Sequence, residues 1–294
     1  MKYSPLLVIL ALALVSCTAN KEPSQQNTKL NVVATFYPLY DLTRSILGDK
    51  GMVYTLVPAN TEPHDYEPKP SDIQKLNSAN AFVTMGIEFA AFEDTLIESI
   101  NPDVAVIPAG RDITLLKASD EQGANDPHIW LSPKNAQEMA AHIVFGLRAI
   151  DPKNQEYYAA NGNLLIAELG ALDQEFKEGL TSCKKDAILV NHNAFSYLGK
   201  DYEFRTITIS GLEPEVEPTP LQIKKIIDEA WKNDIKYVLY ENLIDPRVAT
   251  TIAQEVGAQA LELNPLEGSS NLSETYFTLM RKNLDTLRIA LECP

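Results

Sequence analysis

Short apolar runs alternate with stretches of helical periodicity between residues 30 and 150. The short runs have the length and the β-branched character of buried strands. The stretches between them repeat apolar residues every three or four positions, which predicts helices. Strands are expected at Leu30–Thr35, Val53–Val57, Ala81–Met85 and Val104–Ile107. Strands that alternate with helices in this way predict right-handed βαβ units and a parallel sheet.

The same alternation returns in the second half of the chain. Strands are expected at Ala187–Val190, Phe204–Ile209, Tyr237–Tyr240 and Ala258–Leu263. The predicted fold class is therefore α/β, with an N-terminal lobe over residues 30–150 and a C-terminal lobe over residues 183–294. Each lobe is expected to contain a mainly parallel four-stranded sheet flanked by helices.

Residues 151–182 carry apolar side chains at helical spacing over an unusually long stretch. The apolar positions are Tyr158, Leu165, Leu169, Leu172, Phe176 and Leu180. A helix over this stretch would be about 40 Å long at 1.5 Å per residue. We expect one rigid helix that joins the two lobes. A break near Gly162 or Gly170 would instead give two helices, because glycine weakens a helix interior.

The N-terminus follows none of these patterns. Lys2 precedes the apolar run Leu6–Val15, which is too short to span a bilayer. A small residue and Cys17 follow, which resembles a bacterial lipoprotein signal. Residues 1–17 are therefore predicted to be such a signal, with Cys17 as the lipidated first residue of the mature chain. Residues 18–29 are polar and are predicted to form a flexible tether. The alternative is an ordinary secretory signal.

The net charge of the chain restricts the classes of molecule that it is expected to bind. The chain has 40 Asp and Glu residues against 25 Lys and Arg residues, a net charge of −15. This balance argues against nucleic acids and anionic lipid surfaces as partners. Membrane attachment is therefore expected through the lipid anchor alone.

Two further cysteines, Cys183 and Cys293, flank predicted elements of the C-terminal lobe. In an exported protein such a pair is a possible disulfide. Sequence does not fix the distance between them, so a bridge and free thiols both stay open. A cysteine metal site is disfavoured, since both lie far along the chain from the histidines.

The candidate chemistry lies in the histidines, of which the chain has four. His64, His128 and His192 each fall in a segment where a predicted strand runs out into a loop. Ligands of open parallel sheets bind at such strand ends. Taken alone, each ring could equally bond to nearby backbone, but together they predict three imidazoles on one metal ion. His142 lies inside a predicted helix and is expected to be a surface or packing residue.

Zinc is the first candidate ion. Zn²⁺ accepts three imidazoles and one oxygen in a tetrahedron. Mn²⁺ is the alternative, but it prefers more carboxylate ligands.

Three segments that contain these histidines resemble the zinc/manganese substrate-binding proteins of bacterial ABC importers, the ZnuA/TroA-like family. The segments are Pro63–Asp72, Asp126–Pro133 and His192–Tyr197. The resemblance covers essentially all of the mature chain. It implies a metal ion held between two lobes whose closure the long helix limits. It also implies an ABC permease as the partner, and a monomer.

The fourth ligand departs from the pattern of that family. The family usually carries an Asp, or sometimes a Glu, where this chain has Asn264. An amide oxygen is a weaker, neutral donor to Zn²⁺. We expect Asn264 to bind weakly or through a water molecule. Glu62, Glu262 and Glu267 are the nearby carboxylates that would partly neutralise the site or replace Asn264 as the ligand.

The leading hypothesis is an exported, lipid-anchored protein on the periplasmic or cell-surface side of a bacterial membrane. It would bind Zn²⁺ with high affinity, deliver it to an ABC-type metal importer and catalyse no reaction. A zinc-dependent hydrolase is one alternative, because three histidines with an open position also form a catalytic site. A surface adhesin of the same fold is the other.

Overall fold

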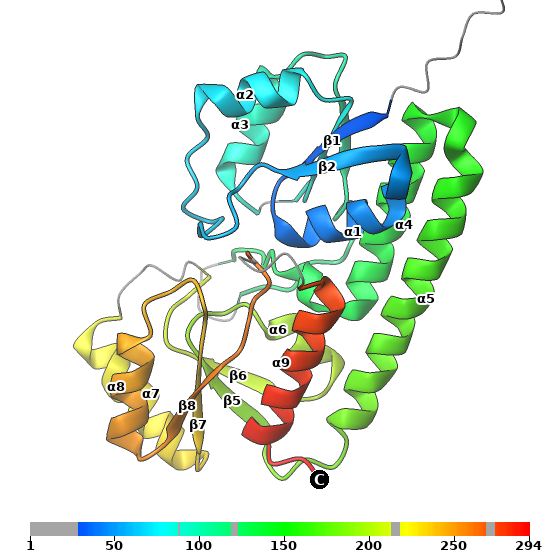
Figure 1. Ribbon diagram of the computed structural model, residues 1–294. Helices are drawn as coiled ribbons and strands as arrows, with labels where there is room; N and C mark the ends of the chain where they lie inside the picture. Colours follow the sequence, from blue (N-terminus) through cyan, green and yellow to red (C-terminus); the bar gives the residue numbers. More distant parts are fainter. Residues whose placement is uncertain (1–28, 88, 119–122, 213–217, 269–273) are drawn as a thin grey trace, which may run out of the picture.

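The computed structural model describes residues 29–294 except 88, 119–122, 213–217 and 269–273. The predicted signal, Cys17 and the predicted tether up to residue 28 lie outside the described residues. Figure 1 shows two lobes, one above the other, with two long helices along one side. Among the helices of the described residues, none is both long enough and apolar enough to cross a membrane.

The N-terminal sheet has four parallel strands in the order β2-β1-β3-β4. These are β1 (Leu30–Ala34), β2 (Gly51–Thr55), β3 (Ala81–Thr84) and β4 (Ala105–Pro108). All residues of β3 are buried, as expected for a parallel strand covered on both faces. In Figure 1 two helices lie above this sheet and α1 lies below it. The helices of this lobe are α1 (Tyr37–Leu47), α2 (Pro70–Asn77), α3 (Ala91–Ser99) and α4 (Pro133–Ile150).

The C-terminal sheet repeats the arrangement, with the parallel order β6-β5-β7-β8. Its strands are β5 (Ala187–Val190), β6 (Arg205–Thr208), β7 (Tyr237–Tyr240) and β8 (Gln259–Glu262). Its helices are α6 (Ser196–Asp201), α7 (Pro220–Lys232), α8 (Arg247–Val256) and α9 (Tyr276–Ala290). Sequence reasoning missed the short helix α6. The prediction of two α/β lobes with parallel four-stranded sheets is confirmed.

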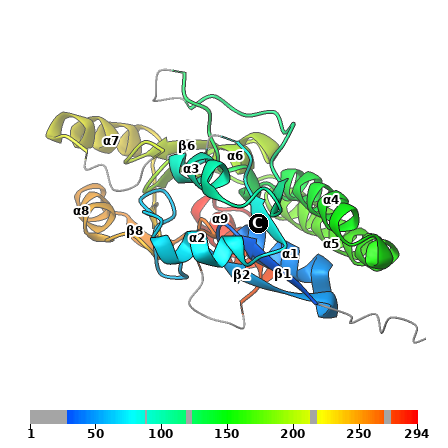
Figure 2. The ribbon, with the colours of Figure 1, turned by 90° about the horizontal axis from the view of Figure 1, so that it is seen from above.

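One uninterrupted helix, α5 (Gln155–Gly179), links the two lobes. It is 25 residues long, which corresponds to about 37 Å, and a short 3₁₀ turn precedes it at Pro152–Asn154. Gly162 does not break it. A Cβ atom there would lie 2.2 Å from Val144 Cγ2 of α4, so the glycine lets the two helices approach closely. Figure 2 shows α4 and α5 side by side, on the opposite side of the molecule from α7 and α8.

Buried apolar side chains form two clusters. The larger extends from the N-terminal sheet through α4 and α5 to α9 and one side of the C-terminal sheet, and it includes Trp130, Tyr158, Phe176 and Tyr276. The smaller lies between the C-terminal sheet and helices α7 and α8. The linking helix thus shares one close-packed core with both lobes, which favours a rigid connection between them.

A disulfide joins Cys183 to Cys293, with an S–S distance of 1.97 Å. The two cysteines are 110 residues apart in the sequence. Cys183 follows α5 and Cys293 follows α9, so the bond ties the end of the linking helix to the end of the chain. In the chain-entropy model, a closed loop of this length restricts the unfolded state by several kcal/mol, about 4.7 kcal/mol for 100 residues.

Candidate metal centre

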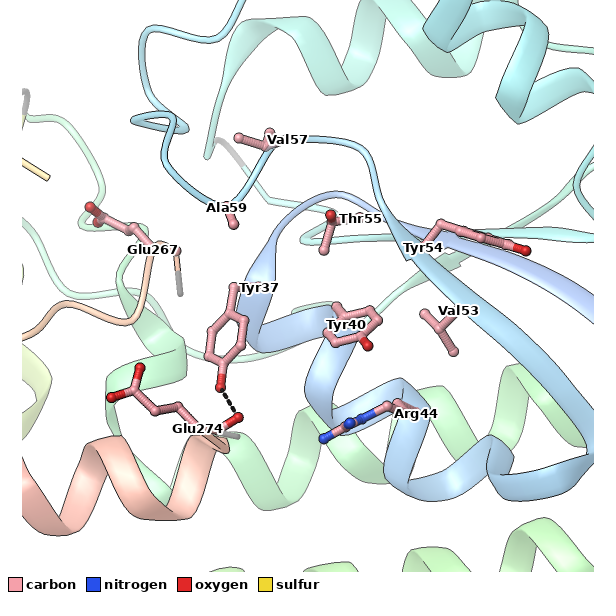
Figure 3. A pocket seen from close by; sticks show the side chains of 11 residues that line it. Tyr37, Tyr40, Arg44, Val53, Tyr54, Thr55, Val57, Ala59, Glu267 and Glu274 are labelled. Carbon is pink, nitrogen blue, oxygen red and sulfur yellow. Dashed lines mark hydrogen bonds between the residues drawn. The ribbon is translucent and has the colours of Figure 1, made fainter. Parts of the chain in front are cut away.

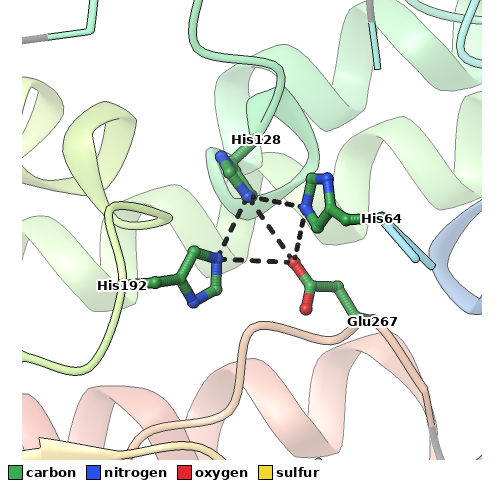
Figure 4. Close-up of side chains that lie close together, drawn as sticks. All are labelled: His64, His128, His192 and Glu267. Carbon is green, nitrogen blue, oxygen red and sulfur yellow. Dashed lines mark hydrogen bonds and ion pairs between the residues drawn. The ribbon is translucent and has the colours of Figure 1, made fainter. Parts of the chain in front are cut away.

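The three histidines predicted as ligands converge on Glu267 between the two lobes. Figure 4 shows the four side chains pointing toward one another. One ligand atom of each of the four lies within 4.8 Å of the ligand atoms of the others. His128 Nε2 lies 3.2 Å from His64 Nε2 and 3.2 Å from His192 Nε2. Glu267 Oε1 lies 3.6 Å from Nε2 of both His64 and His128 and 3.8 Å from Nε2 of His192.

These separations match the edges of a zinc tetrahedron. Zinc bonds of about 2.0–2.2 Å to nitrogen and oxygen place the ligand atoms about 3.3–3.6 Å apart. Five of the six separations lie between 3.2 and 3.8 Å, and the sixth, between the ligand atoms of His64 and His192, is within 4.8 Å. Five of the six edges are thus already close to those of a zinc tetrahedron.

The loop that carries His64 is held by its own residues and by α2. Glu62 Oε1 accepts a hydrogen bond from the backbone N–H of His64 at 3.2 Å. Beyond the histidine, Asp72 Oδ2 accepts hydrogen bonds from Tyr66 OH and from the backbone N–H of Lys69, both at 2.7 Å. These contacts, together with the proline on the N-terminal side of His64, restrict where the ring lies.

His128 is fixed by Asp126 and is fully buried. Asp126 Oδ1 accepts a hydrogen bond from the backbone N–H of His128 at 3.0 Å and from ring Nδ1 at 2.8 Å. A carboxylate has no proton to donate, so Nδ1 carries the hydrogen. The lone pair of His128 Nε2 therefore faces the site, in the orientation that metal-binding histidines adopt.

His192 is oriented in the same way from the C-terminal lobe. It follows strand β5 closely, and its Nδ1 donates a hydrogen bond to the Glu241 carboxylate. Both side chains are buried. The Glu241 carboxylate thus fixes the tautomer in which the Nε2 lone pair of His192 faces the other ligands.

Glu267 supplies the fourth ligand atom, and Asn264 lies differently from the sequence-based expectation. Asn264 Oδ1 accepts a hydrogen bond from the backbone N–H of Leu266 at 2.7 Å. That contact turns the amide oxygen toward its own loop. Of the other two carboxylates considered, Glu62 contacts the His64 loop, whereas Glu262 is exposed at the end of β8. The carboxylate was therefore present in the sequence, but it lies three residues beyond the expected position.

His142 is hydrogen-bonded outside the site. Its Nδ1 lies 2.8 Å from the backbone carbonyl oxygen of Ala109. It is not in the cluster of possible metal ligands that the described residues form. The expectation that it is a surface or packing residue agrees with this position.

The two histidines of the N-terminal lobe are held in the neutral form. Burial lowers the pKa of His64, although the Glu62 carboxylate opposes the shift. Burial also lowers the pKa of His128 to about 4, against the attraction of Asp126. Both rings are therefore unprotonated near pH 7, which is the state that binds metals.

The groups of the C-terminal lobe behave in the opposite way. Burial disfavours the charged form of His192, but the Glu241 carboxylate outweighs it and raises the pKa of His192 to about 9. Burial raises the pKa of Glu267 to about 8. In the N-terminal lobe, burial and repulsion from Glu267 raise the pKa of Glu62, which is not among the four converging donors, to about 8 as well. A cation that binds here near pH 7 must displace protons from its ligands.

Several buried carboxylate oxygens at the site have no hydrogen-bond partner within the described residues. They are both side-chain oxygens of Glu267, Oε2 of Glu62, Oε2 of Glu241 and Oδ2 of Asp126. Buried polar atoms without partners cost free energy. A divalent cation would satisfy Glu267 directly and would balance the negative charge of the others. The donor set and its unsatisfied oxygens thus fit a metal ion.

Asp126 and Glu241 are the functional residues whose roles the sequence did not reveal. Asp126 lies inside a quoted motif, but the motif itself gave it no role. Glu241 follows β7 directly. The strand-end criterion that selected the histidines would also have selected Glu241, had it been applied to carboxylates.

A separate pocket of about 370 Å³ lies beside the site (Figure 3). Its wall is partly aromatic, with Tyr37, Tyr40 and Tyr54. Glu267 is the one metal-site donor that lines it, and in Figure 3 the carboxylate points away from Tyr37 and Tyr40. The metal ligands therefore do not face this pocket.

The sequence model of one protein family matches residues 32–290, and that family is described as the zinc-uptake complex component A periplasmic, ZnuA. The match includes both sheets, the linking helix and all four converging side chains. The chain belongs to this family.

Relatives in the ZnuA family are similar along nearly the whole chain. The high-affinity zinc uptake system protein ZnuA of Bacillus subtilis is 34% identical over 312 residues, covering 99% of this chain and 98% of that protein. The zinc-binding lipoprotein AdcA of Streptococcus pneumoniae serotype 4 is 34% identical over 305 residues. That match covers 98% of this chain but 60% of AdcA, so AdcA is considerably longer.

Solved structures share the fold. The zinc-bound ZnuA-like domain of Streptococcus pneumoniae AdcA has a TM-score of 0.80 and 34% identity, and the match covers 90% of this chain and 100% of that domain. The laminin-binding protein Lmb of Streptococcus agalactiae, described as bifunctional with adhesin and metal-transporting activity, has a TM-score of 0.82 and 29% identity. That match covers 90% of this chain and 100% of Lmb.

Proposed function

We propose that this chain is an extracytoplasmic zinc-binding protein that delivers Zn²⁺ to an ABC-type importer. The observation that carries the proposal is the convergence of three imidazole nitrogens and one carboxylate oxygen between the lobes. Membership of the ZnuA family and the zinc-related names of the relatives support it.

The donor set favours zinc over manganese. Four donors at tetrahedral edge lengths, three of them nitrogens, suit Zn²⁺. Mn²⁺ is better served by sites richer in carboxylate, carbonyl and water oxygens. Cu²⁺ and Ni²⁺ bind such nitrogen donors tightly too, so supply outside the cell contributes to the choice of metal.

The closed donor set also favours binding without catalysis. A catalytic zinc site keeps one position open for water or substrate, whereas here four protein atoms occupy the four corners. His192 and Glu267 come from one lobe, and His64 and His128 come from the other. Displacement of either pair of ligands would therefore divide the ligand set and release the ion to a permease.

The predicted lipoprotein signal supports attachment to the outer face of a membrane. Residues 1–17, with Cys17 as the acylated residue, would leave the folded lobes outside the cytoplasm, tied by residues 18–29. The name of AdcA as a lipoprotein agrees with this arrangement. Metabolic labelling with a radioactive fatty acid tests it: the wild-type chain should be labelled and the Cys17→Ala variant should not.

Competition titration against a zinc chelator tests the function itself. The purified chain should bind one Zn²⁺ ion, and it should prefer Zn²⁺ to Mn²⁺. His192→Ala should weaken zinc binding by orders of magnitude, because it removes a ligand. His142→Gln is the matched control, since that histidine lies outside the cluster, and it should bind as the wild type does. Unchanged zinc binding in His192→Ala would contradict the assignment.

An adhesin role is the second candidate, because the similar structure Lmb is described as a laminin-binding adhesin. Binding of the purified chain to immobilised laminin, with and without zinc, tests this role. Saturable binding would support it, and binding no greater than that to albumin would exclude it for laminin.

A further inference from the structure

The loop Leu263–Gly268 carries Glu267 from strand β8 into the site, and its residues are buried throughout. Its backbone makes an unusual turn immediately before the ligand. Leu266 has φ = 61°, in the left-handed region that residues with a Cβ atom rarely adopt. The Leu266 side chain is fully buried. The direction in which Glu267 leaves the loop depends on this turn.

The side chain of Asn264 stabilises the turn. Its Oδ1 accepts the hydrogen bond from the backbone N–H of Leu266 at 2.7 Å. A side-chain oxygen that bonds to the backbone N–H two residues later forms an Asx turn, which favours such tight bends. This contact offsets part of the cost of the left-handed residue.

A second asparagine, Asn283, fixes the backbone of Asn264. Asn283 on α9 accepts a hydrogen bond from the Asn264 backbone N–H at 2.9 Å and donates one from Nδ2 to the Asn264 carbonyl at 2.6 Å. Asn283 is 2% exposed and Asn264 is 8% exposed. Buried amides satisfied in this way fix backbone position strongly. The start of the ligand loop is thus attached to a helix of the large core.

The end of the loop is fitted against the N-terminal lobe. Trp130 Nε1 donates a hydrogen bond to the Pro265 carbonyl at 2.7 Å. A Cβ atom on Gly268 would lie 2.2 Å from the carbonyl oxygen of Ala59. Trp130 lies two residues after His128, and Ala59 lies in the loop that leads to His64. A shift of this loop would therefore disturb the alignment of Glu267 with the histidines.

We propose that Asn264 is a positioning residue that holds Glu267 on the zinc ion, acting as a hydrogen-bond acceptor within the loop and not as a ligand. The inference rests on the proposed function, because it takes zinc and Glu267 as the pair to be aligned. Without the acceptor, Leu266 is freed from the turn, and Glu267 must be ordered each time the ion binds. Loss of a residue that orients a metal ligand typically lowers affinity about 10- to 100-fold.

Two substitutions at one position separate the acceptor from the rest of the side chain. Asn264→Ala should lower zinc affinity about 10- to 100-fold. With Co²⁺ in place of Zn²⁺, it should also weaken the visible absorption that reports tetrahedral coordination. Asn264→Asp keeps an oxygen toward Leu266 and should bind close to the wild type. Asn264→Ser keeps a hydrogen-bond acceptor on a shorter side chain, so its zinc affinity should lie between those of the other two variants. It replaces the alanine variant in the test if that variant folds poorly.

A double variant tests whether residue 264 ever reaches the metal. Glu267→Ala removes the fourth donor, and Asn264→Asp in that background offers a new carboxylate. Because the oxygen at 264 faces Leu266, the double variant should bind as weakly as Glu267→Ala alone. Restored affinity would show that residue 264 can coordinate, and it would overturn the proposal. The control is Asn161→Ala. Asn161 lies in the linking helix and donates a hydrogen bond to the backbone carbonyl of Ile46, so its removal should leave zinc affinity unchanged.

The remaining outcomes are also decisive. Wild-type affinity and an unchanged Co²⁺ spectrum in Asn264→Ala, with weak binding in Glu267→Ala, would overturn the positioning role and leave the proposed function intact. Equal losses in the aspartate and alanine variants would show that the acceptor is not what matters. Absence of zinc binding in the wild-type chain would overturn the proposed function and this inference together.

Discussion

The two halves of the metal site differ in how they hold protons. The N-terminal lobe supplies His64 and His128, and burial lowers the pKa of both rings. The C-terminal lobe supplies His192 and Glu267, and both of these groups have a raised pKa, about 9 and about 8. One half is thus ready for a cation near pH 7, whereas the other half must exchange protons for it.

In both halves a buried carboxylate orients a histidine, Asp126 for His128 and Glu241 for His192, whereas the loops that carry His64 and Glu267 are held by different contacts. The His64 loop is held by backbone restriction and by contacts with Glu62 and Asp72. The Glu267 loop is held by the buried asparagine pair Asn264 and Asn283. A zinc site between lobes can therefore take two neutral histidines from one lobe and, from the other, a histidine and a carboxylate whose charge partly compensates that of the ion. The predictions below test this difference.

Loss of one ligand from either half should have the largest effect. His128→Ala and Glu267→Ala each leave three donors for a tetrahedral ion. Each should lower zinc affinity by more than the roughly 10- to 100-fold that loss of an orienting residue costs. Competition with chelators of graded affinity measures the change. If one variant bound normally while the other did not, the ion would be held by one lobe and not by both.

Acid should weaken zinc binding through the C-terminal half. His192 and Glu267 have raised pKa values, so they carry protons near pH 7 in the metal-free chain, and Zn²⁺ must displace those protons. Affinity should therefore fall as pH drops from about 8 to about 6, by up to about tenfold per unit for each proton displaced. His128 is neutral through this range and contributes no slope.

Calorimetry of zinc binding in buffers of different ionisation enthalpy counts the released protons directly. We expect net release at pH 7. Binding without proton release, or with an affinity independent of pH between 6 and 8, would contradict the assigned charge states.

The carboxylates that orient His192 and His128 should differ in their effect on the pH dependence of zinc binding. Glu241→Gln and Asp126→Asn should each reduce zinc affinity about 10- to 100-fold, because each loosens the ring that it orients. Glu241→Gln should also make the pH dependence shallower, because the carboxylate that raises the pKa of His192 is gone. Asp126→Asn should leave the slope unchanged. Identical slopes in the two variants would remove the contrast between the halves.

The disulfide should have the smallest effect on zinc. Cys183 follows α5 and Cys293 follows α9, and Figure 1 shows the C-terminus at the end of α9 away from the N-terminal lobe. Replacing both with serine should lower the free energy of unfolding by about 2–5 kcal/mol. Zinc affinity at 25 °C should stay near that of the wild type. Denaturant unfolding and titration of the same sample measure both quantities, and a large loss of affinity would show that the bond shapes the site.

Most of the fold could be predicted from the sequence, because apolar periodicity reports it directly. The strands Ala187–Val190 and Tyr237–Tyr240 were predicted with the bounds that the structure has. The linking helix was predicted as well, although it begins at Gln155 after a 3₁₀ turn. The short helix Ser196–Asp201 was missed, since six residues carry too little periodicity to stand out.

The site was harder to predict at its carboxylates than at its histidines. Three of four histidines in comparable loops form a pattern, whereas acidic residues are numerous and carry no such signal. Glu267 and Asn264 are three residues apart, and between them Leu266 makes a left-handed turn whose backbone N–H is bonded to the Asn264 side chain. That turn depends on Asn283, which is 19 residues away from Asn264 in the sequence. Local pattern alone does not contain this information.

A crystal structure of the zinc-loaded chain, with anomalous diffraction at the zinc edge, tests the central claim most directly. The account predicts one zinc peak, bonded to Nε2 of His64, His128 and His192 and to a carboxylate oxygen of Glu267 at about 2.0–2.2 Å. A peak elsewhere in the chain would contradict it, as would zinc held by the histidines with Asn264 or water in place of Glu267.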